Sequence, residues 1–469
     1  MRMKISINIF CYLWFLACLG ACSDKDSDNA IEPSCSISAD GKEGTRINVE
    51  QSASTLTVSI ESNLAWTLKS DAEWCRVSAI AGVATTVGNP KKMEITVDRN
   101  LQESSRTAKL RLTAGTASAE LEIVQAAFVP VDETEWETAT TAVYNMHVGW
   151  NLGNTLDSYG TGIASGSAPS VYETAWGQPV TTPAMIRKFK EAGFNAIRVP
   201  VTWEPHMDAN NMVEEVWMKR VEEVVNYVLD ADMYCILNVH HDTGTNGWIR
   251  ADWNSYPATG VRFKKLWEQI AARFQKYDKH LLFESYNEML DLNNDWNGTS
   301  ADGYKALNAL AQDFVDVVRQ SGGNNLLRNL VVNTYCAGTG ASMLDSFVLP
   351  TDVVEDRLLA EVHAYIPYSF ALDEESPVVT FTGEGEKEID EIMSRLNERF
   401  CKRNIPVILG ECGAVDKNNM AERVKQAAYT VRAAKQYGIV CFRWMGLLDR
   451  STLEWSEPEI VEAIIQNAK

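Results

Sequence analysis

The chain has 469 residues, which is too long for one ordinary domain and predicts two, each large enough to bury a core. The formal net charge of -20 argues against nucleic acid and anionic membranes as partners, because both are negatively charged. A neutral ligand is compatible with this charge, and the 14 Trp and 15 Tyr residues offer aromatic faces, although core packing accounts for most such residues.

The N-terminal residues 1–21 have the pattern of a targeting segment. Two basic residues precede an apolar run that extends to Leu19 and is too short for a membrane span. The run ends in L-G-A-C, which resembles a bacterial lipobox, so we expect cleavage before Cys22 and a lipid on its thiol. A simple secreted form is the alternative.

Residues 22–33 are acidic and polar, and we expect them to form a flexible tether. An acidic stretch directly after a lipidated cysteine resembles the surface-export signal of Bacteroidetes lipoproteins. The resemblance implies an exported protein that its lipid anchors in the outer membrane at the cell surface.

Ten cysteines are present, and three of them (Cys11, Cys18 and Cys22) belong to the segments just described. The other seven are an odd number without C-x-x-C spacing, which predicts neither a zinc site nor a disulfide framework. We expect buried free thiols there. The six histidines are too scattered to form a metal-ligand set, so neither a metal nor a cofactor is expected.

Residues 34–128 predict an all-β domain. Apolar residues alternate with polar ones in several short runs, as in L-T-V-S-I from Leu56, and turns separate the runs. This pattern predicts an Ig-like sandwich. The region resembles a BACON domain through W-x-L and W-C-x-V at Trp66 and Trp74, through Arg106, and through the closing Val124-Gln125. The two tryptophans could bind sugar, but core packing is the preferred interpretation, and a spacer needs no ligand.

Residues 132–469 predict the second domain, which begins with a short helix containing Trp136, Ala139 and Val143. Eight nearly continuous apolar strands are expected at His147–Asn151, Ala196–Val201, Tyr234–His240, Leu281–Asn287, Leu330–Tyr335, Leu358–Tyr365, Pro406–Glu411 and Ile439–Trp444. Amphipathic helices are expected between them at Pro183–Ala192, Glu214–Ala231, Val261–Tyr277, Ala301–Ser321, Lys387–Lys402 and Met420–Tyr437.

Alternation of buried strands with mostly helical connections predicts a TIM (β/α)₈ barrel. A doubly wound open sheet is the alternative. The segment G-W-N-L-G-N at Gly149–Asn154, where the first strand ends, does not match the G-x-G-x-x-G phosphate fingerprint of such sheets.

Nearly every predicted strand ends in a polar or aromatic residue. In a barrel the C-terminal strand ends meet on one face, where catalytic groups lie. Any single strand-end His or Glu is commonly a satisfied or solvated residue, but solvation alone does not account for the whole set. Two strand-end carboxylates, Glu288 and Glu411, are the arrangement that hydrolysis of a glycosidic bond needs.

Five motifs resemble glycoside hydrolase family 5 in order and approximate spacing. They are I-R-V-P-V-T-W (Ile197–Trp203), N-V-H-H-D (Asn238–Asp242), Y-N-E (Tyr286–Glu288), H-A-Y (His363–Tyr365) and L-G-E (Leu409–Glu411). The segment G-W-N-L-G-N-T-L-D at Gly149–Asp157 and the following A-W-G-Q-P resemble subfamily 4 of endoglucanases and xyloglucanases.

This resemblance implies that Glu288 is the general acid/base and Glu411 the nucleophile. It implies surrounding substrate-binding residues at Arg198, His240, His241, Asn287, His363, Tyr365 and Trp444. The segment R-W-M-G around Trp444 departs from the usual W-D-N-G: the tryptophan is retained, but the resemblance implies no sugar contacts for the residues that follow it.

Elementary chemistry assigns compatible roles to these residues. Retaining hydrolysis needs two carboxyl groups about 5–5.5 Å apart, with pKa values that differ. Arg198 beside Glu411 would keep the attacking carboxylate ionised, and Tyr365 could donate a hydrogen bond to it. Asn287 could reach the sugar 2-hydroxyl, and Trp444 would form the floor of the site.

Long loops at the same face predict a binding cleft. They are Ser158–Ser170, Thr243–Thr259 with Trp248 and Trp253, Met289–Gly303 with Trp296, and Ile366–Gly385 with Tyr368 and Phe381. Aromatic residues along a groove suit a polymer that is cut internally, although each could instead anchor its own loop.

The expected activity is therefore retaining, endo-acting hydrolysis of a β-1,4-glucan such as xyloglucan or mixed-linkage glucan, by a monomer. A β-mannanase on the same barrel is one alternative. A non-catalytic glycan-binding lipoprotein is the other.

Overall fold

The computed structural model describes residues 32–39, 44–49, 54–86, 88–98, 100, 102, 104–127, 136–160, 162–164 and 166–468. The predicted targeting segment, the lipid site at Cys22 and nearly all of the tether lie outside these residues. Within them, every helix is too short or too polar to cross a lipid bilayer.

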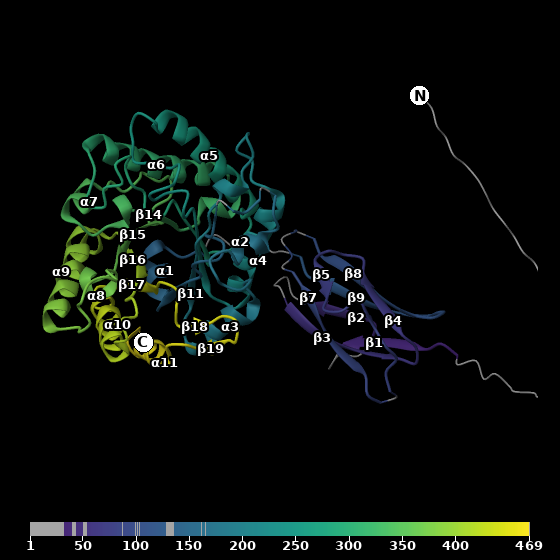
Figure 1. The fold of residues 1–469 in the computed structure, drawn as a ribbon. Coiled ribbons are helices and arrows are strands. Elements are labelled where there is room, and N and C mark those ends of the chain that lie inside the picture. Colours follow the sequence, from purple (N-terminus) through teal and green to yellow (C-terminus); the bar gives the residue numbers. More distant parts are fainter. Residues whose placement is uncertain are drawn as a thin grey trace, which may run out of the picture.

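The N-terminal domain is a β-sandwich, as predicted (Figure 1). One sheet has the order β1-β3-β7-β5 and the other β2-β9-β8-β4-β6. All strand pairs are antiparallel except β2 with β9. The strands are β1 (Cys35–Ala39), β2 (Arg46–Val49), β3 (Ser54–Ser62), β4 (Trp66–Ser70), β5 (Cys75–Val77), β6 (Ala81–Gly82), β7 (Lys91–Val97), β8 (Arg106–Ala114) and β9 (Ala117–Gln125).

The sandwich core forms from the alternating residues of facing strands, such as Val58 and Ile60. Trp66 is 3% exposed and belongs to this core, as the preferred interpretation predicted. Trp74 is half-buried, and the guanidinium carbon of Arg106 lies 4.2 Å from its ring centre. One face of Trp74 is therefore covered by the domain itself.

The second domain is a closed barrel of eight parallel strands, which confirms the TIM prediction and excludes the open sheet. The strands are β10 (Gly149–Asn151), β11 (Ala196–Val199), β12 (Tyr234–Asn238), β13 (Leu281–Glu284), β14 (Leu330–Asn333), β15 (Leu358–Ala364), β16 (Val407–Cys412) and β17 (Val440–Arg443). Closure occurs between β17 and β10. Most strands are shorter than predicted because the polar residues at their C-terminal ends lie in loops.

Helices surround the barrel, and six coincide with the predicted segments: α3 (Pro183–Ala192), α4 (Glu215–Asp230), α5 (Tyr256–Arg273), α6 (Ala301–Gln320), α9 (Gly383–Arg399) and α10 (Met420–Lys435). Helix α5 begins five residues earlier than predicted, because Pro257 lies in its first turn, where proline is tolerated. Elements without a predicted counterpart are α2 (Pro169–Glu173), α7 (Ala341–Ser346), α8 (Tyr368–Ala371), α11 (Pro458–Ala468), and the hairpin β18 (Leu448–Asp449) with β19 (Glu454–Trp455).

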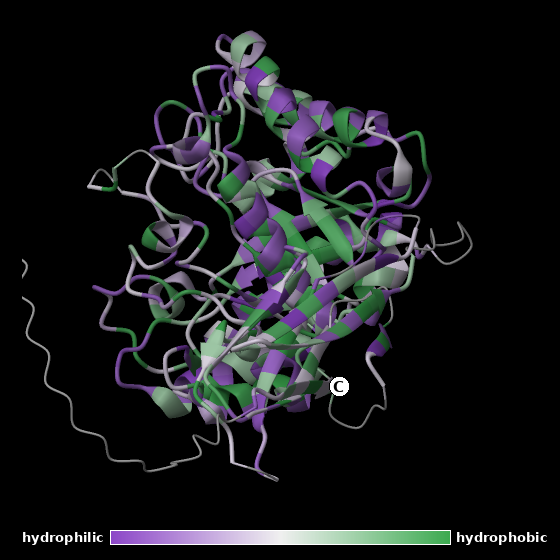
Figure 2. Ribbon diagram, turned by 90° about the vertical axis from the view of Figure 1, so that its right-hand side faces the viewer, coloured by the Kyte–Doolittle hydropathy of each residue, from purple (hydrophilic) through white to green (hydrophobic). Residues whose placement is uncertain are grey.

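Helix α1 (Ala139–Asn145) closes the N-terminal end of the barrel. Its buried residues Ala142 and Val143 pack against strand residues such as Ile236 and Leu282. A larger apolar core fills the layer between strands and outer helices, and Figure 2 shows green, hydrophobic segments in the central strands. With one end closed by α1, the opposite, C-terminal end is left for the functional site.

The cysteines agree with the prediction of free thiols. In the part of the chain that the structure describes, none is in a disulfide, and Cys75, Cys235, Cys336, Cys412 and Cys441 are buried.

Candidate active site

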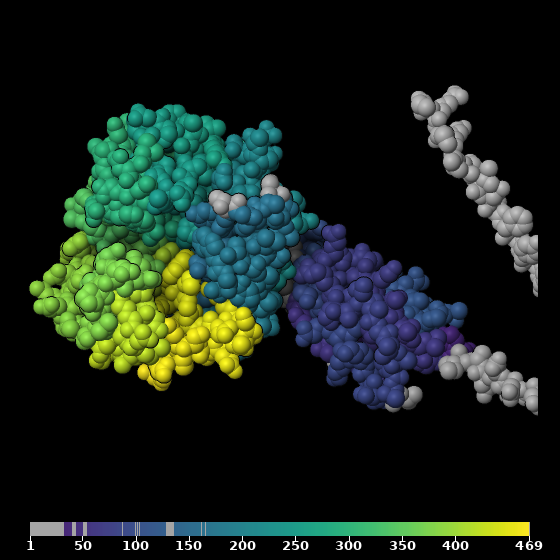
Figure 3. Space-filling model, in the orientation of Figure 1, coloured from purple at the N-terminus to yellow at the C-terminus, as the bar shows by residue number. Residues whose placement is uncertain are grey.

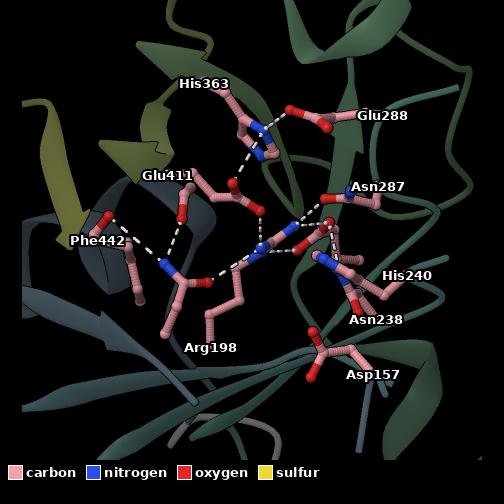
Figure 4. Close-up of polar contacts among 12 residues, drawn as sticks. Asp157, Arg198, Asn238, His240, Asn287, Glu288, His363, Glu411 and Phe442 are labelled. Carbon is pink, nitrogen blue, oxygen red and sulfur yellow. Dashed lines mark hydrogen bonds and ion pairs between the residues drawn. The ribbon is translucent and has the colours of Figure 1, made fainter. Parts of the chain in front are cut away.

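The polar strand-end residues meet at the C-terminal end of the barrel (Figure 4). Figure 3 shows a hollow in this region, where the yellow and green segments face the blue and teal ones. Arg198 lies on β11, His363 on β15 and Glu411 on β16, while Asn287 and Glu288 follow β13.

Glu288 and Glu411 are brought close together. One carboxylate oxygen of each lies within 4.8 Å of the other and of a ring nitrogen of His363. Glu411 is 5% exposed, whereas the Glu288 side chain is 25% exposed. The separation matches the short spacing of retaining glycosidases and is too small to place a water between the two carboxylates, as inversion requires.

Arg198 is fully buried and lies beneath Glu411. Its Nη1 donates to Glu411 Oε1 at 2.9 Å, and its Nη2 donates to Asn287 Oδ1 at 2.7 Å. Its Nε and Nη2 also donate to the two oxygens of Glu284 at 2.6 and 2.8 Å. The guanidinium fork therefore fixes Asn287 and Glu411 relative to each other.

His363 lies between the two carboxylates. Its Nδ1 is 2.7 Å from Glu288 Oε1 and 3.6 Å from Glu411 Oε2, and its Nε2 is 3.2 Å from Glu361 Oε1. Burial lowers the pKa of His363, but the surrounding carboxylates, Glu411 first, raise it to about 10. The imidazole is therefore a cation at neutral pH and donates from both nitrogens.

Glu411 also accepts a hydrogen bond of 2.9 Å from the Tyr365 hydroxyl, as predicted. Burial and the nearby carboxylates raise the pKa of Tyr365, so this group remains a donor. Burial also raises the pKa of Glu411, while His363 and Arg198 oppose the rise. The predicted contact of Arg198 with Glu411 is present, and Arg198 acts in the predicted direction, because its charge opposes the rise in the Glu411 pKa that burial causes.

His240 and Trp444 form one wall of the site. Their rings are nearly parallel, with centres 5.7 Å apart, and Trp444 is half-buried. Burial lowers the pKa of His240 well below its ordinary value, so the ring is neutral and its Nδ1 accepts from the Asn238 amide at 3.1 Å. His241 is partly exposed, with Nε2 3.7 Å from Asp157 Oδ2.

Comparison with known families decides the classification of this barrel. The family model described as cellulase (glycosyl hydrolase family 5) matches residues 156–446, which is more than half of the chain. The chain belongs to glycosyl hydrolase family 5. A BACON model, described as a putative binding domain, matches residues 64–126 of the sandwich.

The family 5 chain is similar to several named enzymes. Endoglucanase A of Clostridium longisporum is 38% identical over 356 residues, which cover 72% of this chain and 68% of that protein. A family 5 enzyme from Prevotella bryantii, solved with a xyloglucan tetradecasaccharide, is 45% identical with a TM-score of 0.68, covering 71% of this chain and 99% of that one.

A third similar protein matches both domains in length. The Bacteroides ovatus family 5 xyloglucanase, solved with an XXXG heptasaccharide, is 26% identical with a TM-score of 0.66. The match covers 92% of this chain and 100% of that one. The enzyme described here is therefore a glycoside hydrolase.

A cluster of aromatic rings adjoins the site of this family 5 enzyme at His241, whose ring lies 4.5 Å from that of His240. The rings of Tyr159 and Trp176 lie 5.6 and 5.2 Å from the His241 ring, and the Trp176 indole nitrogen donates to the Tyr159 carbonyl at 2.9 Å. Trp176 belongs to A-W-G-Q-P, which the sequence marks as a motif, but its contact with His241 was not predicted.

Sequence reasoning also assigned no role to Glu284 and Glu361, which are fully buried beneath the site. In the sequence, Glu361, His363 and Tyr365 occupy alternate positions, as do Glu284, Tyr286 and Glu288, which predicts that each set lies on one side of its strand. This alternation does not hold after Glu284, where β13 ends. The Tyr286 hydroxyl points away from the site and donates to the Leu307 carbonyl of α6.

Four of the predicted loop aromatics of the family 5 enzyme divide into two groups. Trp248 donates to Asp242 and lies under the Arg262 guanidinium, and Phe381 is buried, so both anchor their loops. Trp296 and Tyr368 are 48% and 62% exposed and are available to a ligand. The predictions that no metal and no cofactor are used remain predictions.

Proposed function

We propose that this enzyme is an endo-acting β-1,4-glucan hydrolase that retains anomeric configuration, with Glu411 as the nucleophile and Glu288 as the general acid/base. The observation that carries the proposal is the approach of the two carboxylates to within 4.8 Å, with His363 between them.

In the first step, a Glu411 oxygen forms a bond to the anomeric carbon as the glycosidic bond breaks, and the Glu288 proton passes to the leaving oxygen. In the second, water attacks the same carbon, Glu288 takes its proton, and the bond to Glu411 breaks. Arg198 and Tyr365 each hold one oxygen of Glu411, which fixes the carboxylate for both steps.

The remaining residues would orient the sugar. Because Asn287 Oδ1 accepts from Arg198, its amide nitrogen would be the group that donates to the sugar 2-hydroxyl. Trp444 would lie under the attacked sugar. The half-exposed Trp176 and the exposed Trp296 lie on loops that follow β10 and β13, at the same end of the barrel as the catalytic pair, and suit a polymer rather than a single sugar.

We propose xyloglucan and mixed-linkage glucan as the substrates. The proposal is supported by the endoglucanase relative, by the xyloglucan-bound Prevotella bryantii structure and by the Bacteroides ovatus xyloglucanase. A β-mannanase remains the alternative activity, since it would use the same pair of carboxylates.

The experiment measures reducing ends released from xyloglucan, barley β-glucan, cellulose and β-mannan, with viscosity followed in parallel. A rapid fall in viscosity before many ends appear indicates internal cleavage. NMR of the first product should show the β-anomer, whereas an initial α-anomer would contradict retention.

Glu411→Ala should abolish nearly all turnover with the fold intact, and activity within a few-fold of wild type would reject the nucleophile assignment. Release from mannan alone would favour the mannanase. If no reducing ends are released from any of these polysaccharides, the alternative of a non-catalytic glycan-binding lipoprotein would be favoured.

We further propose that lipid on Cys22 anchors the enzyme at the outer surface of the cell and that the sandwich is a spacer. Labelled palmitate should enter wild type but not Cys22→Ala, and protease should remove the enzyme from intact cells.

Isolated residues 32–128 should not be retarded in a glucan-containing gel; retardation would give the sandwich a binding role. We propose a monomer, which size-exclusion chromatography with light scattering tests.

A further inference from the structure

Glu361 on β15 contacts partners of both catalytic carboxylates. Its Oε1 lies 3.3 Å from Arg198 Nε and 3.2 Å from His363 Nε2. Arg198 donates to Glu411, and His363 contacts Glu288. The fully buried Glu361 carboxyl group therefore connects Arg198, which contacts Glu411, with His363, which contacts Glu288.

The barrel provides a specific space for this carboxyl group. Gly410 precedes Glu411, and a Cβ at position 410 would lie 1.6 Å from Glu361 Oε1. The absence of a side chain at Gly410 is thus what admits the Glu361 carboxyl. Such close packing fixes the oxygen that faces His363.

The charges around Glu361 come from three strands. Arg198 approaches from β11, Glu284 from β13, and His363 lies two residues along β15 itself. Burial and the Glu284 charge raise the pKa of Glu361 to about 7, while Arg198 and His363 oppose the rise. Glu361 therefore changes charge near neutral pH, whereas Glu284, hydrogen bonded twice to Arg198, stays ionised.

We propose that Glu361 is a positioning residue, which accepts the Nε2–H of His363 and so keeps a cationic Nδ1–H directed at Glu288. This inference rests on the proposed function of Glu288. When Glu288 gives up its proton to the leaving oxygen it becomes negative, and an imidazolium 2.7 Å away stabilises the charge. Without the Glu361 anion the imidazolium would lose its proton at lower pH.

Glu361→Gln tests the proposal, because the amide has the shape of the neutral acid but no negative charge at any pH. At about pH 5, where Glu361 is neutral, kcat/KM should stay within a few-fold of wild type. The alkaline limb of the pH profile of kcat/KM should move to lower pH by at least about half a pH unit. The loss of activity on that limb should appear in kcat more than in KM.

Glu173→Gln is the matched control. Glu173 is also fully buried and paired with an arginine, with Arg220 Nε at 2.7 Å, but lies outside the site. The Glu173→Gln variant should have a lower melting temperature, but both limbs of its pH profile should stay where they are in wild type. An unmoved alkaline limb in Glu361→Gln would overturn the proposal.

If Glu361→Gln does not fold, the wild-type enzyme gives the second measurement. Nitrogen-15 NMR of histidine-labelled protein, with the His363 signal assigned by its loss in His363→Asn, should show an imidazolium with both nitrogens protonated through about pH 8. A neutral ring at about pH 7 would refute the inference. Failure of the proposed function itself would be distinct, since wild type would then release no sugar.

Discussion

Arg198 Nη1 donates a hydrogen bond of 2.9 Å to Glu411 Oε1 from a guanidinium group that has no exposed surface. The same group also reaches Asn287 and both oxygens of Glu284. One rigid fork thus orients the proposed nucleophile and a residue proposed to bind the sugar, and a flexible ammonium group cannot reproduce those directions.

Arg198→Lys should therefore lower kcat by about 100-fold or more, because one ammonium nitrogen does not reproduce the planar fork that holds Glu411 and Asn287 together. Steady-state kinetics on soluble xyloglucan would measure the loss. The exposed Arg187→Lys is the control and should retain wild-type activity. A kcat within about threefold of wild type for Arg198→Lys would contradict this argument, since a positive charge at position 198 would then be sufficient without the guanidinium fork.

Trp176→Ala should weaken binding of long glucans without slowing the chemical step. Trp176 is half-buried and its ring contacts are with Tyr159 and His241, so we expect it to contribute uniform binding. We expect KM on xyloglucan to rise about tenfold with kcat nearly unchanged, and a short aryl glycoside to be cleaved as by wild type. Equal losses in kcat on both substrates would place Trp176 in the chemistry instead.

Gly410→Ala should destabilise the barrel, because the new methyl group would overlap Glu361 Oε1 at 1.6 Å. Overpacking of this kind costs about 1–3 kcal/mol, and displacement of a buried carboxyl adds to it. Thermal unfolding would record the loss as a lower melting temperature. Gly162→Ala is the matched control, since a Cβ there would meet nothing within 4 Å. Equal melting temperatures for the two variants would contradict the packing argument.

Stability should fall in acid because His206 is buried in the neutral state. Its ring stacks on Trp217 with centres 3.5 Å apart, and burial lowers its pKa from 6.5 to about 3. Below pH 6.5 the unfolded chain therefore binds a proton that the folded chain does not bind. The free energy of unfolding should decrease by about 1.4 kcal/mol for each pH unit from this group alone, until about pH 3.

His206→Phe keeps an aromatic ring on Trp217 and removes the titration. Denaturant unfolding at several pH values should give a shallower slope for this variant than for wild type between about pH 6.5 and 4. His147→Gln removes an exposed histidine and serves as the control. Parallel slopes for His206→Phe and wild type would rule out this contribution.

The sequence alone determined the architecture and pointed to the proposed catalytic pair. Eight apolar runs with helical segments between them specify a barrel, because buried parallel strands need helices on their outer face. Strand ends of a barrel converge on one rim, so Glu288 and Glu411 could be paired although 122 intervening residues separate them. These inferences need only the period of the pattern and the ends of the strands.

Only the tertiary structure decided which groups touch beneath that rim. Alternate side chains lie on the same face only within a hydrogen-bonded strand. This rule correctly places Glu361 and His363 on one side of β15. It does not apply beyond the end of β13, where Tyr286 points away from the site. The contact of Glu361 with Arg198 and the space at Gly410 depend on barrel closure and on the register shift after Val362. Those distances arise from packing between distant strands, which no local period in the sequence encodes.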